Sequence, residues 1–174
     1  APTFEHYYWV DNDRLEFIQS NYSPKIVEAF KKLQIGAAQA DYWRALVLLK
    51  YGGIYMDIDT VCLAPLRTFI HPEDDIVSGI GMRGDLHQWG LAYAPQHPIM
   101  KRTLELCVAN VLERKFIPSF ENTLEGLTGP PCLDRAIKTL LHLPLEAQFQ
   151  AGLYEIDIED RKTRIRLYEK DLFN

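Results

Sequence analysis

Two aspartates that directly follow a short apolar run are the residues of this chain with the clearest chemical use. Residues 54–59 alternate apolar and polar side chains, and in a strand this pattern places Asp57 and Asp59 on one face, about 6.5–7 Å apart. Two carboxylates held this close repel each other unless a cation shares the site. Mg²⁺ and Mn²⁺ prefer such oxygen ligands and leave further positions to water and phosphate oxygens. The spacing therefore predicts a Mg²⁺ or Mn²⁺ site at Asp57 and Asp59.

An arginine upstream can supply a matching positive charge. Asp41 and Arg44 are three residues apart, which places both on one face of a helix. The planar guanidinium of Arg44 carries paired donors that suit a phosphate group. If this helix face borders the cleft of Asp57 and Asp59, the cleft combines a metal, an arginine and free carboxylates for sugar hydroxyls. That combination is what a nucleotide-sugar site needs.

The elements that must position these residues can be read from the same stretch. Residues 37–51 contain neither Pro nor Gly and repeat apolar side chains at helical spacing, which predicts a helix. Gly52 and Gly53 end it, because glycine adopts the positive φ of a helix C-terminus at little cost. A link this short makes the strand over residues 54–59 run back beside the helix. We therefore expect Arg44 and the strand-end carboxylates to reach one cleft.

This stretch also resembles a known family, the DXD-motif glycosyltransferases of the GT-A fold. The resemblance is to the branch that holds capsular-polysaccharide sugar transferases and fungal initiating mannosyltransferases and, more distantly, the glucosylating domains of clostridial toxins. It rests on three groups of residues at fixed spacing: Asp41-x-x-Arg44, Gly52-Gly53-Ile54-Tyr55-x-Asp57-x-Asp59 and Pro65-Leu66.

The resemblance implies a reaction and roles for the residues that match the motif. The reaction would move a sugar from a UDP- or GDP-linked donor to a hydroxyl of a glycan or lipid-linked acceptor, with retention of the anomeric configuration. Asp59 would ligate the metal directly, and Asp57 would contact the ribose, a sugar hydroxyl or metal-bound water. Asp41 would bind a sugar hydroxyl, and Arg44 the sugar or the diphosphate. Asp57, Asp59 and Arg44 are thus the predicted catalytic residues.

Three further positions follow from the resemblance. Tyr55 would pack and hydrogen-bond beside the diphosphate. The strand predicted over residues 86–94 would border the sugar pocket, which makes Gln88 a candidate for substrate binding. Residues 128–131, Thr-Gly-Pro-Pro, predict a helix start, because proline suits the first helical turn. In the resembling family a Gly-Pro pair often stands at the cleft rim.

The whole chain, residues 1–174, is expected to form one α/β domain of GT-A-like type. Alternating strand and helix signals predict a mixed, mainly parallel sheet with helices on both faces. The resemblance implies that a first strand–helix unit is lacking. The predicted strands cover residues 5–10, 75–82, 86–94 and a final antiparallel pair at 153–158 and 164–168, and the predicted helices cover residues 14–22, 24–33, 97–115 and about 130–143.

Composition excludes several classes of function. The formal net charge is −5 and no basic block occurs, which argues against nucleic acid as a partner. No apolar run approaches the roughly 20 residues of a membrane span. Cys62, Cys107 and Cys132 are odd in number and lack metal-site spacing, so we expect buried thiols in a reducing compartment. This favours the cytoplasm; a signal anchor upstream of the chain would favour the Golgi lumen.

Two alternatives stay open at this point. Asp57 and Asp59 after an apolar strand also fit the opening motif of haloacid-dehalogenase-like phosphatases, in which the first aspartate is a nucleophile. That family needs a later acidic pair, and Asp74–Asp75 follows too soon. The second alternative is a trimmed, non-catalytic domain that binds nucleotide-sugar or a protein partner.

Overall fold

A five-stranded mixed sheet forms the centre of the structure, a computed structural model that describes residues 4–113 and 124–169. Its strands are β1 (Gly53–Met56), β2 (Ile76–Ile80), β3 (Leu86–Tyr93), β4 (Gly152–Ile158) and β5 (Arg161–Tyr168). Their order across the sheet is β1-β3-β2-β5-β4. The expected mixed α/β class is confirmed.

The expectation of a mainly parallel sheet is wrong for the described strands. Only β2 and β5 pair in parallel, whereas β1–β3, β2–β3 and β4–β5 are antiparallel. The reason lies in the connections. Short links between β2 and β3 and between β4 and β5 make hairpins, and hairpin neighbours are antiparallel, whereas parallel neighbours need a long crossover.

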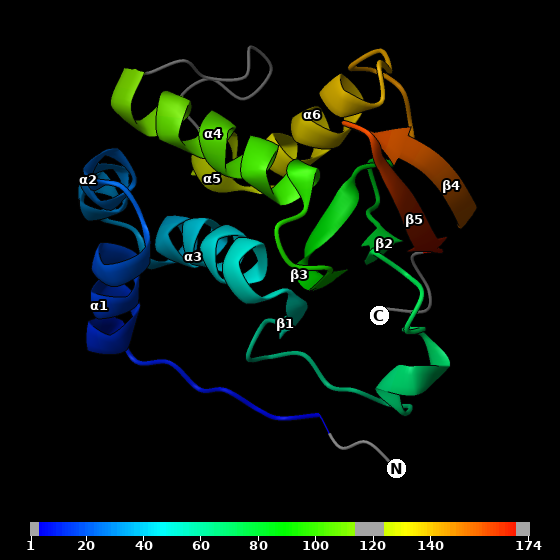
Figure 1. Ribbon diagram of the computed structural model, residues 1–174, viewed down its shortest axis with the longest axis horizontal. Coiled ribbons are helices and arrows are strands. Elements are labelled where there is room, and N and C mark those ends of the chain that lie inside the picture. Colours follow the sequence, from blue (N-terminus) through cyan, green and yellow to red (C-terminus); the bar gives the residue numbers. More distant parts are fainter. Residues whose placement is uncertain (1–3, 114–123, 170–174) are drawn as a thin grey trace.

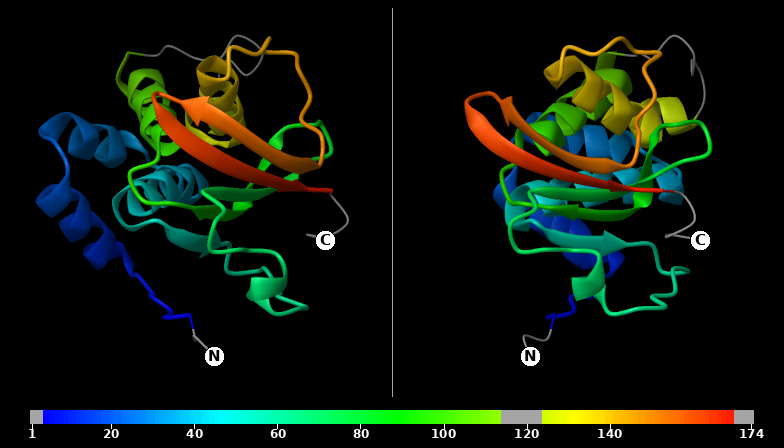
Figure 2. Two further views of the ribbon diagram at one scale, coloured as in Figure 1. Left: turned by 45° about the vertical axis from the view of Figure 1, so that its right-hand side comes forward. Right: turned by 90° about the vertical axis from the view of Figure 1, so that its right-hand side faces the viewer.

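The described residues also form six α-helices and one short 3₁₀ helix. They are α1 (Asp11–Asn21), α2 (Pro24–Lys32), α3 (Gly36–Tyr51), α4 (Pro98–Glu113), α5 (Leu124–Thr128), α6 (Pro130–Leu140) and the 3₁₀ helix η1 (Leu66–Thr68). The helices from α3 to α6 lie on one face of the sheet, and η1 with its flanking loops lies on the other (Figures 1 and 2). The expected arrangement of helices flanking the sheet is confirmed.

Most elements predicted from periodicity are confirmed, including the pair at the C-terminus. The helix predicted over residues 97–115 is confirmed from Pro98 to Glu113, and residues 114–123 lie outside the described residues. Residues 124–128 form α5, which the sequence did not predict.

The N-terminal stretch differs from its prediction. Residues 5–10 are not a strand, and helix α1 begins at Asp11, where a turn was expected. Trp9 packs edge-on against Phe17 and Trp43, with ring centroids 5.4 and 5.2 Å apart. The aromatic residues that suggested a strand thus pack against helices, since no strand pairs with this stretch in the described structure.

The segment after β1 also differs from its prediction. The strand ends at Met56, and residues 57–60 form a turn closed by a hydrogen bond from the Thr60 N–H to the Asp57 carbonyl, 3.0 Å long. Ile58, expected on a buried face, is 91 % exposed. The turn ends the period-two alternation, so Asp57 and Asp59 do not share a strand face.

The cysteines and the helices bear on two expectations from composition. All three cysteines are free thiols; Cys107 and Cys132 are buried, but Cys62 is exposed, contrary to expectation, because it lies in the loop after the turn. Among the described residues, no helix combines the length and apolar character that a membrane crossing requires.

Candidate functional site

Arg44 is the centre of a buried polar cluster that joins three elements. It lies on α3 and is 6 % exposed. Its Nη1 donates to the carbonyl oxygen of Gln88 on β3 at 2.6 Å. Its Nη2 lies 3.2 Å from Oδ1 of Asp41 and donates to Oδ1 of Asp57, just after β1, at 3.1 Å. The short Gly-Gly link therefore brings the helix arginine and the first aspartate of the motif together.

Tyr55 holds the same oxygen of Asp57 from the other side. Its hydroxyl donates to Asp57 Oδ1 at 2.8 Å, and its ring lies under the guanidinium of Arg44, with Cζ 4.6 Å from the ring centroid. Burial raises the pKa of Tyr55 to about 12, which keeps the phenol protonated and able to donate. Two donors thus fix the orientation of the Asp57 carboxylate.

Asp41 is the second carboxylate of the cluster, and its side chain is 15 % exposed. Its Oδ2 accepts a hydrogen bond from Oγ1 of Thr128 at 3.3 Å. Burial raises the pKa of Asp41 to about 6, although Arg44 and the Thr128 hydroxyl act in the opposite direction. Asp41 is therefore a carboxylate whose charge depends on pH near neutrality.

Gln88 is buried, at 3 % exposure, and its side chain bridges the same corner. Its Nε2 donates to the carbonyl oxygen of Thr128 at 3.3 Å. Its Oε1 has no hydrogen-bond partner among the described residues. Because the Thr128 carbonyl can only accept, it fixes which end of the amide faces it. The Oε1 of Gln88 is thus a buried acceptor without a partner among the described residues.

Asp59 is not brought into this cluster. It is exposed in the turn after β1 and makes no hydrogen bond or ion pair with the described residues. In Asp57, Oδ1 accepts hydrogen bonds from Arg44 and Tyr55, whereas Oδ2 has no hydrogen-bond partner among the described residues. Within the described ranges, no group of three or more His, Cys, Asp or Glu side chains could hold a metal.

The donor set nevertheless fits a hard divalent ion. Asp57 and Asp59 offer carboxylate oxygens that no described side chain occupies, and Mg²⁺ or Mn²⁺ is commonly held by one or two carboxylates together with water and substrate phosphates. Such a site would be completed by the substrate rather than by a protein cage.

Thr128 is the member of the cluster that the sequence did not identify. The Thr-Gly-Pro-Pro stretch predicted a helix start, and α6 does begin at Pro130, but nothing in the spacing indicated a contact with Asp41. The two residues are 87 positions apart, so the only available signal was the expected cleft-rim location of the Gly-Pro pair.

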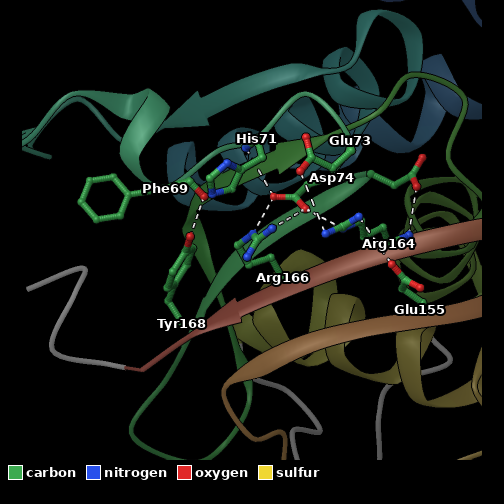
Figure 3. Close-up of polar contacts among 9 residues, drawn as sticks. Phe69, His71, Glu73, Asp74, Glu155, Arg164, Arg166 and Tyr168 are labelled. Carbon is green, nitrogen blue, oxygen red and sulfur yellow. Dashed lines mark hydrogen bonds and ion pairs between the residues drawn. The ribbon is translucent and has the colours of Figure 1, made fainter.

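The acidic pair considered for the phosphatase alternative lies elsewhere in the structure. Asp74 is bound by Arg164 and Arg166 of β5 (Figure 3). Asp75 pairs with Arg161 at 2.8 Å. Both carboxylates pair with arginines of β5, and neither forms a hydrogen bond with Asp57 in the described structure. Asp74 and Asp75 are therefore not the second acidic pair that the phosphatase alternative needs beside Asp57.

Comparison with known proteins identifies the region around the motif. Residues 1–77 match the family described as glycosyltransferase sugar-binding region containing DXD motif. This part of the chain is therefore similar to the sugar-binding regions of DXD glycosyltransferases. The match includes Asp41, Arg44 and both aspartates of the DXD motif.

Curated relatives and a solved structure extend the similarity beyond residue 77. The chain is 30 % identical over 132 residues to mannosyl phosphorylinositol ceramide synthase SUR1 of Saccharomyces cerevisiae, covering 74 % of this chain and 32 % of that protein. It is 27 % identical over 138 residues to the initiation-specific alpha-1,6-mannosyltransferase of Candida albicans, covering 73 % and 34 %. The chain thus spans about a third of the length of these relatives.

The fold resembles that of the PaToxG glycosyltransferase, with a TM-score of 0.53 at 22 % identity, over 77 % of this chain and 55 % of that one. This likeness concerns the fold. It agrees with the glycosyltransferase fold expected from the sequence.

Proposed function

We propose that this chain is the catalytic domain, or part of it, of a metal-dependent glycosyltransferase that uses a nucleotide-diphosphate sugar. The observation that carries the proposal is the Arg44 cluster, in which residues of the motif form a buried, hydrogen-bonded set of acceptors beside the DXD turn. The family match and the mannosyltransferase relatives support it.

Within this proposal the sugar is bound by acceptors that the cluster holds in place. Asp41 and the free Oε1 of Gln88 accept hydrogen bonds from sugar hydroxyls. Arg44 acts mainly by orienting Asp41 and Asp57, because its terminal nitrogens already face these carboxylates and the Gln88 carbonyl. Tyr55 keeps Asp57 oriented from below the guanidinium.

Asp57 and Asp59 would hold Mg²⁺ or Mn²⁺ together with the donor diphosphate. The bound ion would supply Lewis-acid stabilisation of the charge that develops on the leaving diphosphate, which is worth several kcal/mol. Asp59 contributes as an exposed carboxylate free to meet the ion, and Asp57 as one already oriented by the cluster. The acceptor is proposed to be a glycan or lipid-linked hydroxyl, and the reaction to retain anomeric configuration.

Nucleotide release from sugar donors tests this function. The full chain is incubated with Mn²⁺ and GDP-mannose or UDP-glucose, and the released nucleoside diphosphate is measured. Asp59→Asn is expected to lower release by about a hundredfold or more, equivalent to about 2.7 kcal/mol at the transition state. The melting temperature should not fall, because Asp59 is exposed and has no described partner.

Asp157→Asn is the matched control, since Asp157 is an exposed aspartate on β4, at the far edge of the sheet from β1. It should leave release unchanged. Normal release by Asp59→Asn would remove the metal role of the motif. Orthophosphate release from a phosphomonoester, with no release from either sugar donor, would favour the phosphatase. Binding of both donors without release would favour a non-catalytic domain.

A further inference from the structure

Thr128 occupies a buried corner between the candidate sugar site and the helices behind it. Its side chain is fully buried, and its hydroxyl donates to Oδ2 of Asp41. Its carbonyl oxygen accepts from Nε2 of Gln88 and, at 3.8 Å, from the thiol of Cys107. One residue thus contacts both proposed sugar-binding acceptors while itself being shielded from solvent.

A second group of contacts fixes the backbone that carries Thr128. Asn110 of α4 is 2 % exposed, and its Nδ2 donates to the carbonyl oxygens of Gly126 at 2.9 Å and Leu127 at 3.2 Å. Gly129 follows with no room for a side chain, since a Cβ there would lie 2.9 Å from backbone atoms of Glu125. The hydroxyl of Thr128 is therefore held in place by its surroundings.

The charge of Asp41 depends on the groups that face it from each packed element. Arg44 on α3 favours the carboxylate, whereas Asp57 beyond β1 and Glu125 on α5 disfavour it. On α4, a hydrogen bond with Cys132 and burial raise the pKa of Cys107, which therefore faces this corner as a neutral thiol. Besides Arg44, the Thr128 hydroxyl is the group that lowers the pKa of Asp41.

We propose that Thr128 is a positioning residue of the sugar site: its clamped hydroxyl holds Asp41 as an oriented carboxylate, ready to accept a hydrogen bond from the donor sugar. Thr128 acts through Asp41 and does not itself touch substrate. The inference rests on the proposed function, in which Asp41 binds the sugar. It adds to the site a residue that lies 87 positions after Asp41 in the sequence.

Titration of Asp41 tests the inference without substrate. The ¹³C shift of the Asp41 carboxyl is followed with pH in the full metal-free chain for wild type, Thr128→Val and Thr128→Ser. Valine keeps the volume but loses the donor, so the Asp41 midpoint should rise by about one pH unit. Serine keeps the donor and should leave the midpoint within a few tenths of wild type. An unchanged midpoint in Thr128→Val overturns the proposal.

If Thr128→Val does not unfold cooperatively, Thr128→Cys replaces it. A thiol is a weaker donor than a hydroxyl. The Asp41 midpoint in Thr128→Cys must then exceed the wild-type midpoint by less than one pH unit. An Asp41 midpoint equal to that of wild type again overturns the proposal.

The pH dependence of nucleotide release from GDP-mannose or UDP-glucose with Mn²⁺ gives the functional counterpart. With the midpoint about one unit higher, the ionised fraction of Asp41 at pH 6 falls from about half to about a tenth. Release by Thr128→Val should therefore drop about fivefold at pH 6 and approach wild type at pH 8. A merely structural loss would lower release equally at both pH values, and that result would also overturn the proposal.

Asp41→Asn separates failure of this inference from failure of the proposed function. If Asp41→Asn releases nucleotide normally, the sugar-binding role of Asp41 is wrong. If Asp41→Asn is inactive while Thr128→Val keeps the wild-type pH profile, only the role of Thr128 is wrong.

Discussion

Two of the clusters of arginine and aspartate among the described residues differ in how fully their carboxylates are bound. Beside β1, one arginine, Arg44, faces two carboxylates, Asp41 and Asp57. Beside β5, the carboxylate of Asp74 faces two arginines, Arg164 and Arg166, and Arg164 also pairs with Glu73 and Glu155 (Figure 3). In the sheet, strands β3 and β2 lie between β1 and β5.

In the Asp74 cluster, both carboxylate oxygens have hydrogen-bond partners. The side chain of Asp74 is fully buried; Arg166 binds both of its oxygens, through Nε at 2.7 Å and Nη2 at 3.0 Å. Arg164 Nε adds an ion pair at 3.4 Å, without hydrogen-bond geometry, and the His71 N–H donates to Oδ2 at 3.3 Å. Nearby, the Tyr168 hydroxyl donates to the Phe69 carbonyl, so the loop carrying η1 is tied to β5.

The Arg44 cluster contains acceptor atoms without a hydrogen-bond partner among the described residues. Gln88 Oε1 is buried without a described partner, and the pKa of Asp41 is raised towards neutrality. A buried ion pair whose acceptor atoms all have partners within the chain stabilises the structure. A buried ion pair beside acceptor atoms without such partners indicates a binding site. The following three substitutions test this contrast, from the largest expected effect to the smallest.

Asp74→Asn should destabilise the protein by about 3 kcal/mol. Removing the carboxylate leaves two arginines without their common partner, and breaking a buried pair costs about 3–5 kcal/mol; the low end applies because both arginines are partly exposed. Urea unfolding followed by circular dichroism measures the change, with Asp157→Asn as the exposed control. Undiminished stability, together with lost nucleotide release, would place Asp74 in a functional site instead.

Asp41→Asn should change stability in the opposite direction, by about 2 kcal/mol at pH 7. The folded pKa of Asp41, about 6, lies above its ordinary value, so the native state binds more protons than the unfolded state between about pH 4 and pH 6. At low pH, protonated Asp41 contributes to the free energy of unfolding, and this contribution is lost as the pH rises through 6. Asparagine stays neutral and avoids that loss.

The difference between Asp41→Asn and wild type should therefore be small at pH 4 and large at pH 7. Thermal unfolding at both pH values measures it. A variant that is less stable than wild type at pH 7 would mean that the pairing with Arg44 outweighs the cost of burying the carboxylate.

Arg44→Lys should lower nucleotide release at least tenfold, equivalent to about 1.4 kcal/mol. A lysine cannot bind the Gln88 carbonyl and two carboxylates at once in the planar arrangement of a guanidinium. Steady-state kinetics at saturating donor measure the loss. Arg166→Lys, the matched change in the Asp74 cluster, should leave release per folded molecule unchanged. Wild-type turnover and donor affinity in Arg44→Lys would remove Arg44 from the site.

Much of the local structure could be predicted because its causes are local. The helix over residues 37–51, its end at Gly52 and the proximity of Arg44 to Asp57 follow from spacing and from a link too short for any other path. The prediction that Asp57 and Asp59 share a strand face is wrong, because where β1 ends depends on its pairing with β3, which the sequence of β1 does not contain.

The sequence by itself determined which side chains carry charge near the motif, the helix that presents Asp41 and Arg44, and the family resemblance. Only the tertiary structure decided that Thr128 reaches Asp41 across 87 residues and that Asp74 is bound by arginines about 90 residues later in the chain. The physical reason is that side-chain periodicity records a residue's own element, whereas contacts between distant elements depend on strand order and connections. Here those connections favoured hairpins, and they made the sheet mainly antiparallel.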